Sequence, residues 1–208
     1  MKDKELERLT NLKQIEKELH EKGFKNICGI DEAGRGPLAG PVVVAGVIMP
    51  ENSMIEGVND SKKVSEKKRE LLYDKIIEEA ISYSVAIIGQ DVIDDINILE
   101  ATKKAMIEAV NNLSVKPEHL LIDAVKLNVD IPQTSIIKGD AKSESIAAAS
   151  IIAKVTRDRM MIELDKEHPE YDFKHNKGYG TKKHIDAIEK YGILKEHRKT
   201  FAPCNKYV

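Results

Sequence analysis

The segment between residues 26 and 49 leaves few structural options. Two apolar runs, 26–31 and 41–49, flank a link rich in glycine and proline, and the second run is β-branched and almost entirely apolar. Runs of this kind predict strands, and a strand that is apolar throughout is buried on both faces. The first run ends on two acids, Asp31 and Glu32, which lead directly into Gly34-Arg35-Gly36. A strand end that presents carboxylates beside a bare glycine backbone suits a divalent metal and a phosphodiester.

The rest of the chain alternates between helical and strand patterns. We predict strands at 26–31, 41–49, 82–89, 120–123 and 134–138, and helices at 3–21, 65–80, 98–113, 142–164 and 181–191. Leu71, Leu72, Ile76 and Ile77 are expected to face the core, and Thr181 to cap the last helix. Small residues at 147–150 should let the longest helix lie close against the sheet. Interleaved strands and helices indicate an α/β or α+β fold around one mixed sheet.

Length and composition restrict the class of protein. A chain of 208 residues, 41% of them hydrophobic, suggests one compact domain of residues 26–208, preceded by an N-terminal amphipathic helix within residues 1–25. No stretch approaches about 18 consecutive apolar residues, and the charged N-terminus lacks the apolar core of a signal peptide. We therefore expect a cytoplasmic protein that does not associate with membranes. The two cysteines, Cys28 and Cys204, lack metal-binding spacing.

Positive charge is concentrated near the C-terminus, although the net charge is only −2. Residues 174–208 contain nine Lys or Arg against three Asp or Glu, a local balance of +6. Such a segment can form the electrostatic footprint of a nucleic-acid backbone. It can equally be the solvated surface of lysine-rich helices. Charge alone does not separate these two interpretations.

Four acids stand out because they follow predicted strands. Asp31 and Glu32 end the first strand, Asp123 ends the fourth, and Asp140 follows the fifth. Strand ends are where α/β sheets bind ligands, and clustered carboxylates raise one another's pKa unless a cation compensates. Mg²⁺ and Mn²⁺ prefer oxygen ligands, and a pair of such ions could activate a water and stabilise a leaving oxygen. Because successive strand residues point to opposite faces, the two adjacent acids share a face only if the strand bends there.

The glycine loop also matches a different motif. Gly34-x-Gly36-x-x-Ala39 after a strand follows the dinucleotide-binding pattern of oxidoreductases, which requires a helix to begin at the loop. Pro37 and Pro41 flank the site and the chain continues as a strand, so we interpret the match as accidental. The alternative is a glycine bulge at a hairpin corner, whose exposed amides could hold a hydroxyl or a phosphate.

Five separate segments together resemble the ribonuclease HII family. They are GIDEAGRGPLAGPVV at 29–43, NDSKK at 59–63, KGDAK at 138–142 with AAASIIAKVTRD at 147–158, HNKGYGT at 175–181 and HRKTF at 197–201. The resemblance implies a ribonuclease H-like fold, with helices flanking a mixed five-stranded sheet and a helical C-terminal region at about 165–208. It implies an endonuclease that hydrolyses RNA in RNA–DNA hybrids and cuts 5′ of single ribonucleotides in duplex DNA, leaving 3′-hydroxyl and 5′-phosphate ends. Such an enzyme serves ribonucleotide removal from DNA and RNA primer removal.

The resemblance also assigns roles by position. Asp31, Glu32, Asp123 and Asp140 resemble the family's catalytic, metal-binding carboxylates, which implies two Mn²⁺ or Mg²⁺ ions during catalysis. Asp123 lies in a short local context, and Asp130 is the alternative to it.

The remaining roles concern the substrate. Gly34-Arg35-Gly36 resembles the loop whose backbone reads the 2′-hydroxyl, the one group that separates RNA from DNA, and Tyr179 resembles the aromatic that packs on the sugar. Lys62 resembles a phosphate contact. Lys142 and Lys154 either touch phosphate or line the long helix, and no histidine is assigned a catalytic role.

Two other protein classes share part of this pattern. Ribonuclease HIII resembles the chain around the acids but has an N-terminal substrate domain, for which residues 1–25 are too short. We therefore expect the HII type, acting as a monomer on RNA–DNA hybrid and on ribonucleotide-containing duplex DNA. A non-catalytic nucleic-acid-binding module on the same fold would bind hybrid through residues 174–208 and cleave nothing.

Overall fold

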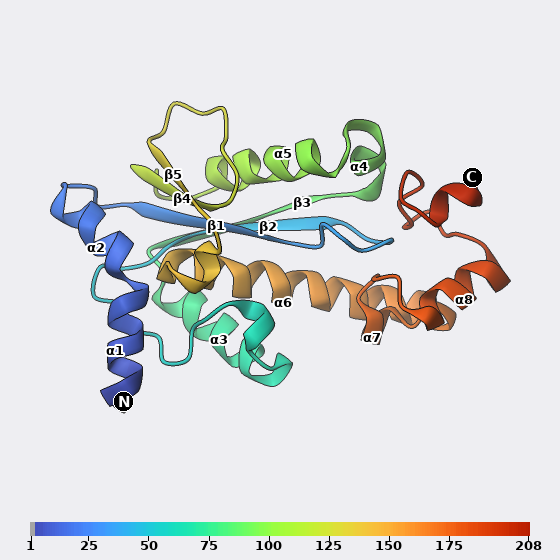
Figure 1. Ribbon diagram of the computed structural model, residues 1–208, viewed down its shortest axis with the longest axis horizontal. Helices are drawn as coiled ribbons and strands as arrows, with labels where there is room; N and C mark the ends of the chain where they lie inside the picture. The colour runs from blue at the N-terminus through green and yellow to red at the C-terminus, as the bar shows by residue number, and fades with distance from the viewer. Residues whose placement is uncertain (1–2) are drawn as a thin grey trace.

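The computed structural model describes residues 3–208, which fold around one five-stranded sheet (Figure 1). Its strands are β1 (Ile27–Ala33), β2 (Val42–Ile48), β3 (Ser82–Ile88), β4 (His119–Asp123) and β5 (Gln133–Ile136). They lie in the order β3-β2-β1-β4-β5. The β1–β2 and β2–β3 pairs are antiparallel, whereas the β1–β4 and β4–β5 pairs are parallel. The predicted mixed sheet of five strands is confirmed.

Helices cover both faces of this sheet. They are α1 (Asp3–Leu12), α2 (Gln14–Glu21), α3 (Glu66–Glu79), α4 (Gln90–Ile96), α5 (Ile98–Asn111), α6 (Glu144–Glu167), α7 (Phe173–Asn176) and α8 (Lys182–Tyr191). In Figure 1, α5 lies over one face of the sheet and α6 over the other, with α3 outside α6. One apolar cluster fills the space between α6, α3 and the sheet, and a second lies between α5 and the sheet. α7 and α8 lie beyond the end of the sheet, as the predicted helical C-terminal region.

The longest helix approaches β1 closely because few side chains separate the two backbones. Residues 147–149 of α6 are alanines with no exposed surface. A Cβ atom on Gly29 would overlap the backbone of Ser145 and Ile146, so only glycine fits at this strand position. The small-residue prediction is confirmed. The expected cap of α8 is also present, because the Thr181 hydroxyl accepts the His184 N–H at 3.3 Å.

The helix predicted at 3–21 is two helices that meet at Lys13. Helical hydrogen bonding continues through the junction, where the Lys13 N–H donates to the Leu9 carbonyl at 3.1 Å. The chain bends because the two helices pack on different clusters: Leu9 joins the core between β2 and α6, whereas Leu19 packs with Ile27. Both helices therefore lie against the sheet and its helices, and a domain boundary at residue 25 stays a prediction.

One expectation about helices was wrong, and one helix was not predicted. Leu71 is 60% exposed, because Leu72 and Ile76 already form the buried stripe of α3 and Leu71 is turned about 100° away from Leu72. α4 was missed, since Ile93 is its one fully buried residue and so short a helix shows no apolar periodicity. Within residues 3–208, no helix combines the length and apolar character needed to cross a membrane.

Candidate active site

Two of the four selected carboxylates leave the sheet side by side. β1 and β4 are parallel neighbours in which Ile30 pairs with Ile122, so the residues that follow, Asp31 and Asp123, emerge at the same edge. Asp140 joins them from a short 3₁₀ turn, Gly139–Ala141. The Asp123 Oδ1 atom accepts a hydrogen bond from the Gly139 N–H at 3.0 Å, which holds this turn against the end of β4.

The charges of these acids act on one another. Burial raises the pKa of Asp31 well above its ordinary value, and the negative charge of Glu32 adds to it, with smaller contributions from Asp123 and Asp140. Burial likewise raises the pKa of Asp140, and the charges of Asp60 and Asp123 raise it further. Because such effects act over short distances, the four selected acids form one cluster that favours a compensating cation.

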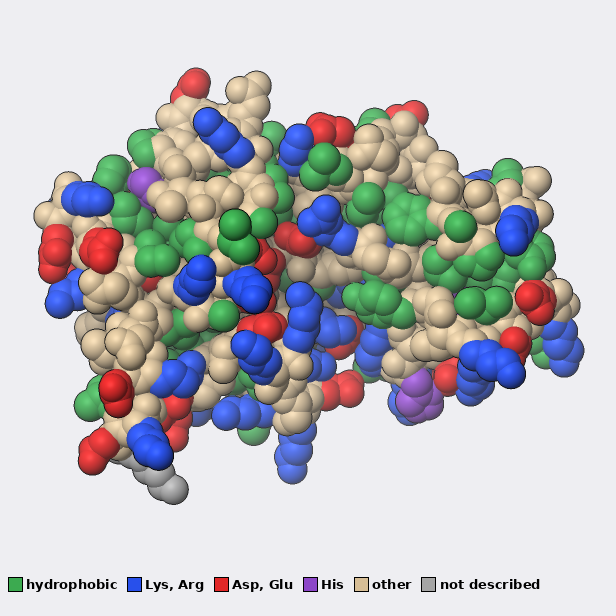
Figure 2. Space-filling view, viewed as in Figure 1, with side chains coloured by type: hydrophobic (Ala, Val, Ile, Leu, Met, Phe, Trp, Pro, Cys, Tyr) green, Lys and Arg blue, Asp and Glu red, His purple; other side chains and the backbone are tan. Residues whose placement is uncertain are grey.

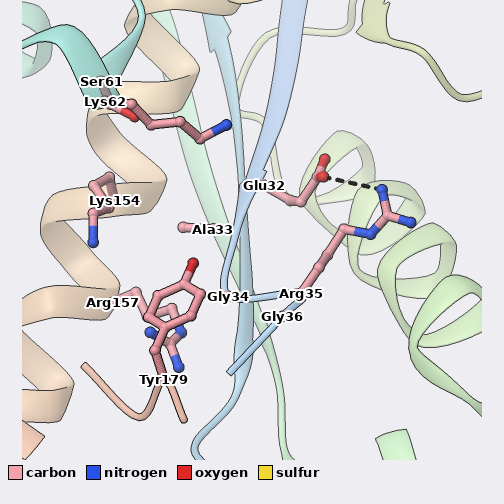
Figure 3. A pocket seen from close by; sticks show the side chains of 10 residues that line it. All are labelled: Glu32, Ala33, Gly34, Arg35, Gly36, Ser61, Lys62, Lys154, Arg157 and Tyr179. Carbon is pink, nitrogen blue, oxygen red and sulfur yellow. Dashed lines mark hydrogen bonds and ion pairs between the residues drawn. The ribbon is translucent and has the colours of Figure 1, made fainter. Parts of the chain in front are cut away.

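Glu32 occupies the edge of this cluster. Its carboxylate forms an ion pair with the Arg35 guanidinium at 3.4 Å and is turned away from Tyr179 (Figure 3). Burial raises the pKa of Glu32, although Arg35 opposes the shift. The Asp31 Oδ1 atom accepts the Glu32 N–H at 2.8 Å. The two adjacent acids therefore stay close at the strand end.

The cluster suits ions that are shared with a substrate. Within residues 3–208, no three His, Cys, Asp or Glu side chains converge tightly enough to form a ready-made metal cage. Mg²⁺ does not require one, since it keeps several waters and binds through one or two carboxylates together with substrate phosphates. The donors present are all hard oxygens, which fits Mg²⁺ or Mn²⁺. Asp130 is exposed in the β4–β5 connection and contributes to none of the pKa shifts of the other acids.

A fifth acid and a lysine complete the cluster. Asp60, to which we assigned no role from sequence, accepts the Lys62 N–H at 2.9 Å and places its charge near Asp140. Burial lowers the pKa of Lys62, but the charges of Asp31, Asp60 and neighbouring acids outweigh it and raise the pKa. The Lys62 ammonium therefore lies among the carboxylates, as a phosphate contact would require. The sequence signal for Asp60 was its place in the NDSKK segment.

A pocket of about 160 Å³ adjoins the acids (Figure 3). It is lined by Glu32, Ala33, Gly34, Arg35, Gly36, Ser61, Lys62, Lys154, Arg157 and Tyr179. The structure thus brings every residue that we selected for substrate binding into one cavity. The Tyr179 ring lies beside the glycine loop, where a Cβ on Gly36 would be 3.6 Å from Tyr179 Cε1, and its hydroxyl points toward Ala33 (Figure 3). Lys154 lines the same pocket and forms an ion pair with Asp158 at 2.6 Å.

Two buried arginines hold the glycine loop through its carbonyls. The Arg157 guanidinium donates to the carbonyls of Pro41 at 2.9 Å and Ala39 at 3.0 Å, and it also donates to Lys177 at 2.8 Å. Arg198 donates to the carbonyls of Gly34, Arg35 and Gly40 at 2.6 to 3.1 Å. Burial lowers the pKa of Arg157 to about 10 and the pKa of Arg198 to about 9, so both remain charged at neutral pH.

These bonds determine which way the loop amides face. In a trans peptide the C=O and the following N–H point in opposite directions. The carbonyls of Gly34 and Arg35 point to Arg198, so the N–H groups of Arg35 and Gly36 point away from it. Gly34 has a φ of +95°, and a Cβ there would overlap the Arg157 side chain, so this position requires glycine. The loop leads directly into the antiparallel strand β2 rather than into a helix, which excludes a dinucleotide-binding turn.

The basic C-terminal segment is mostly surface. Seven of its nine cations are exposed lysines, at 174, 182, 183, 190, 195, 199 and 206. Arg198, which is included in the charge count of this segment, is fully buried against the glycine loop. Figure 2 shows Lys and Arg side chains gathered around the middle of one face, with acidic side chains between them.

A mixed sheet with carboxylates at adjacent parallel strand ends, beside a glycine-lined pocket with lysines, is the arrangement expected of a ribonuclease H-like fold. The family model described as Ribonuclease HII matches residues 28–204. Ribonuclease HII of Bacillus cytotoxicus is 63% identical over 204 residues, which cover 98% of this chain and 79% of that protein. The chain belongs to the ribonuclease HII family.

Solved structures show the same fold. Ribonuclease H2 from Pyrococcus horikoshii OT3 matches with a TM-score of 0.74 and 30% identity, over 88% of this chain and 96% of that chain. Bst-RNase HIII, solved in complex with Mn²⁺, matches with a TM-score of 0.66 and 20% identity, over 90% of this chain and 70% of that chain. At that identity the second likeness shows the fold alone.

Proposed function

We propose that this nuclease is a metal-dependent endoribonuclease that hydrolyses the RNA strand of RNA–DNA hybrids and cuts 5′ of single ribonucleotides in duplex DNA. The products would carry 3′-hydroxyl and 5′-phosphate ends. The observation that carries the proposal is the junction of two parts: a carboxylate cluster at the ends of β1 and β4, and a pocket that joins Gly34-Arg35-Gly36 to Tyr179. One part suits phosphodiester hydrolysis, and the other suits recognition of a ribose.

The acids would hold the ions. We assign Asp31, Glu32, Asp123 and Asp140 as ligands of two Mn²⁺ or Mg²⁺ ions, supported by their mutual effect on pKa and by their oxygen donors. Bound divalent ions supply an activated water and stabilise charge on the leaving oxygen. Lys62 lies close enough to the acids to contact the phosphate that the ions would share.

The pocket would recognise the ribose. The N–H groups of Arg35 and Gly36 face away from Arg198, so they are free of the carbonyl network behind the loop and can donate to a 2′-hydroxyl. The Tyr179 ring, 46% exposed, offers an apolar face for a sugar and a hydroxyl for the same 2′-hydroxyl. DNA lacks that group and would leave these donors without a partner.

We propose further that the enzyme acts as a monomer in the cytoplasm, in ribonucleotide removal from DNA and in RNA primer removal. Support for the monomer is that one chain supplies every residue of the proposed site. Both cysteines, Cys28 and Cys204, are free and buried, which agrees with a reducing compartment.

The test compares three 5′-labelled duplexes in Mg²⁺ or Mn²⁺: all-DNA, DNA with one ribonucleotide, and RNA–DNA hybrid. We expect cleavage of the last two only, with product ends identified by mass spectrometry. Asp31→Asn and Asp123→Asn should abolish cleavage without loss of folding, whereas Asp130→Asn serves as the matched control and should cleave normally. Binding of hybrid without cleavage under both ions would instead establish the non-catalytic binding module.

A further inference from the structure

The closing segment, which we define as Leu194–Arg198, lies behind both walls of the pocket and lines neither. Ala39 pairs with His197 as an antiparallel bridge, and the Arg198 N–H donates to the Leu38 carbonyl at 2.8 Å. On its other side, the Leu38 N–H donates to the Gly178 carbonyl at 2.8 Å. The end of the glycine loop is therefore bound between the closing segment and the turn that carries Tyr179.

Two histidines connect the closing segment to that turn directly. The Leu194 N–H donates to His197 Nδ1 at 2.9 Å, so Nδ1 carries no proton and the neutral ring is protonated at Nε2. His197 Nε2 lies 3.0 Å from His184 Nε2, which must then accept. The proton of His184 is left on Nδ1, which donates to the Tyr179 carbonyl at 2.9 Å. The contacts thus specify one tautomer for each ring.

The environment keeps both rings neutral. His184 and His197 are fully buried, and Tyr171 and Phe173 pack around them with ring centroids 5.3 to 6.3 Å away. Burial lowers the pKa of both histidines, and the proximity of His184 helps to lower the pKa of His197 to about 4. A core position that required only volume would not use all four ring nitrogens in directed hydrogen bonds.

The closing segment also binds the glycine loop, which forms the other wall of the pocket. Arg198 follows His197 in the chain and binds the carbonyls of Gly34 and Arg35. A Cβ on Gly178 would lie 2.5 Å from the Ala39 carbonyl oxygen, so the two walls meet here without an intervening side chain. The dipeptide His197-Arg198 is thereby hydrogen-bonded to the glycine loop and, through His184, to Tyr179.

We propose that His184 and His197 are positioning residues, which hold the Tyr179 turn in register with the glycine loop held by Arg198. Ribonucleotide selectivity then depends on residues that never touch the substrate. The proposal rests on the function proposed above, because it assumes that Tyr179 meets the ribose. It deepens that function by naming what sets the distance between the two halves of the sugar pocket.

Two substitutions at one position separate this role from simple support of the fold. In His197→Gln, the amide N–H can replace Nε2 and still donate to His184, whereas the acceptor for Leu194 is lost. In His197→Asn, the amide oxygen can replace Nδ1 and accept from Leu194, whereas the donor to His184 is lost. We expect Asn to lower kcat on the one-ribonucleotide duplex about 10- to 100-fold with little change in KM, and Gln to retain most of the activity.

A double-substitution cycle with Tyr179→Ala shows whether the effect passes through the ring. We expect His197→Asn to cause no further loss of kcat in that background, because coupled residues are not additive. Additive losses, or equal activity of His197→Gln and His197→Asn, would overturn the proposal.

Nuclear magnetic resonance gives a readout that does not depend on cleavage. The ¹⁵N shifts of the wild-type rings should show a proton on His197 Nε2 and on His184 Nδ1, and bare nitrogens at the other two positions. The Tyr179 ring signals should move in His197→Asn and stay in place in His197→Gln. Any other pair of tautomers would refute the chain of hydrogen bonds that runs from Leu194 through His197 and His184 to Tyr179. An inactive wild type with these spectra would refute the proposed function but would still support this chain of hydrogen bonds.

Discussion

The buried histidine pair predicts a specific loss of stability in mild acid. The perturbation is a change from pH 7 to pH 5, compared between the wild type and His197→Gln, which has no titrating group at this position. Burial and the neighbouring His184 lower the pKa of His197 from its ordinary 6.5 to about 4 in the folded protein. Between pH 6.5 and about 4, the unfolded chain therefore binds a proton at His197, whereas the folded protein does not.

The sign follows from this difference in proton binding. A depressed folded-state pKa leaves stability intact above pH 6.5, and stability falls as the pH drops from 6.5 toward 4. The full difference of pKa corresponds to about 3 kcal/mol, and about 2 kcal/mol of it is lost between pH 7 and pH 5. Burial of Asp31 and Glu144 raises the pKa of each, which acts in the opposite direction, but both proteins share these groups and their effect cancels.

The assay is urea unfolding followed by far-ultraviolet circular dichroism at pH 7, 6 and 5, without metal. We expect the wild type to lose about 2 kcal/mol more of unfolding free energy than His197→Gln over this range. Equal slopes of stability against pH in the two proteins, or a steeper slope in the variant, would show that His197 is not held neutral by the fold.

Three further predictions concern the backbone contact, the pocket and the metal. Gly29→Ala should destabilise the protein by about 3 kcal/mol, because its Cβ would overlap the Ser145 backbone, whereas Gly89→Ala, where a Cβ meets nothing within 4 Å, should not; thermal unfolding of both variants decides this. Tyr179→Ala should lose far more activity on a one-ribonucleotide duplex than it loses in Tm, and Tyr179→Phe should show an intermediate rate; unchanged kcat in the Ala variant would mean that the ring is only structural. Excess chelator should stop cleavage and added Mn²⁺ or Mg²⁺ should restore it, and undiminished cleavage in chelator would contradict the assignment of Asp31 and its neighbours as metal ligands.

Much of the fold followed from local patterns. The strands at 27–33 and 42–48 agree with the predicted runs to within about two residues, because a continuous apolar run can be satisfied only by burial. The cap at Thr181 also follows from a short-range hydrogen bond. The bend at Lys13 did not, since it depends on which clusters the two halves of the N-terminal helical region meet.

Part of the candidate site likewise followed from the sequence, and part of it did not. Its acids, glycine loop and Tyr179 were selected from motifs, and the pocket joins the loop to Tyr179 beside the acids. The contribution of Asp60 to the cluster was missed because Asp60 follows no predicted strand, although it lies in the NDSKK segment. The direction of Glu32, toward Arg35 and away from Tyr179, depends on how the strand end bends and is visible only in three dimensions (Figure 3).

The amino-acid sequence alone determined the order of the strands and of the longer helices, the family and the residues selected for the site, because periodicity and motifs are properties of neighbouring residues. Only the tertiary structure decided that Arg198 and His197 are fully buried. The bond from Arg198 to the Gly34 carbonyl spans 164 residues of sequence. A side chain that looks exposed by composition becomes buried when distant carbonyls satisfy its donors, and no local pattern encodes where those carbonyls will lie.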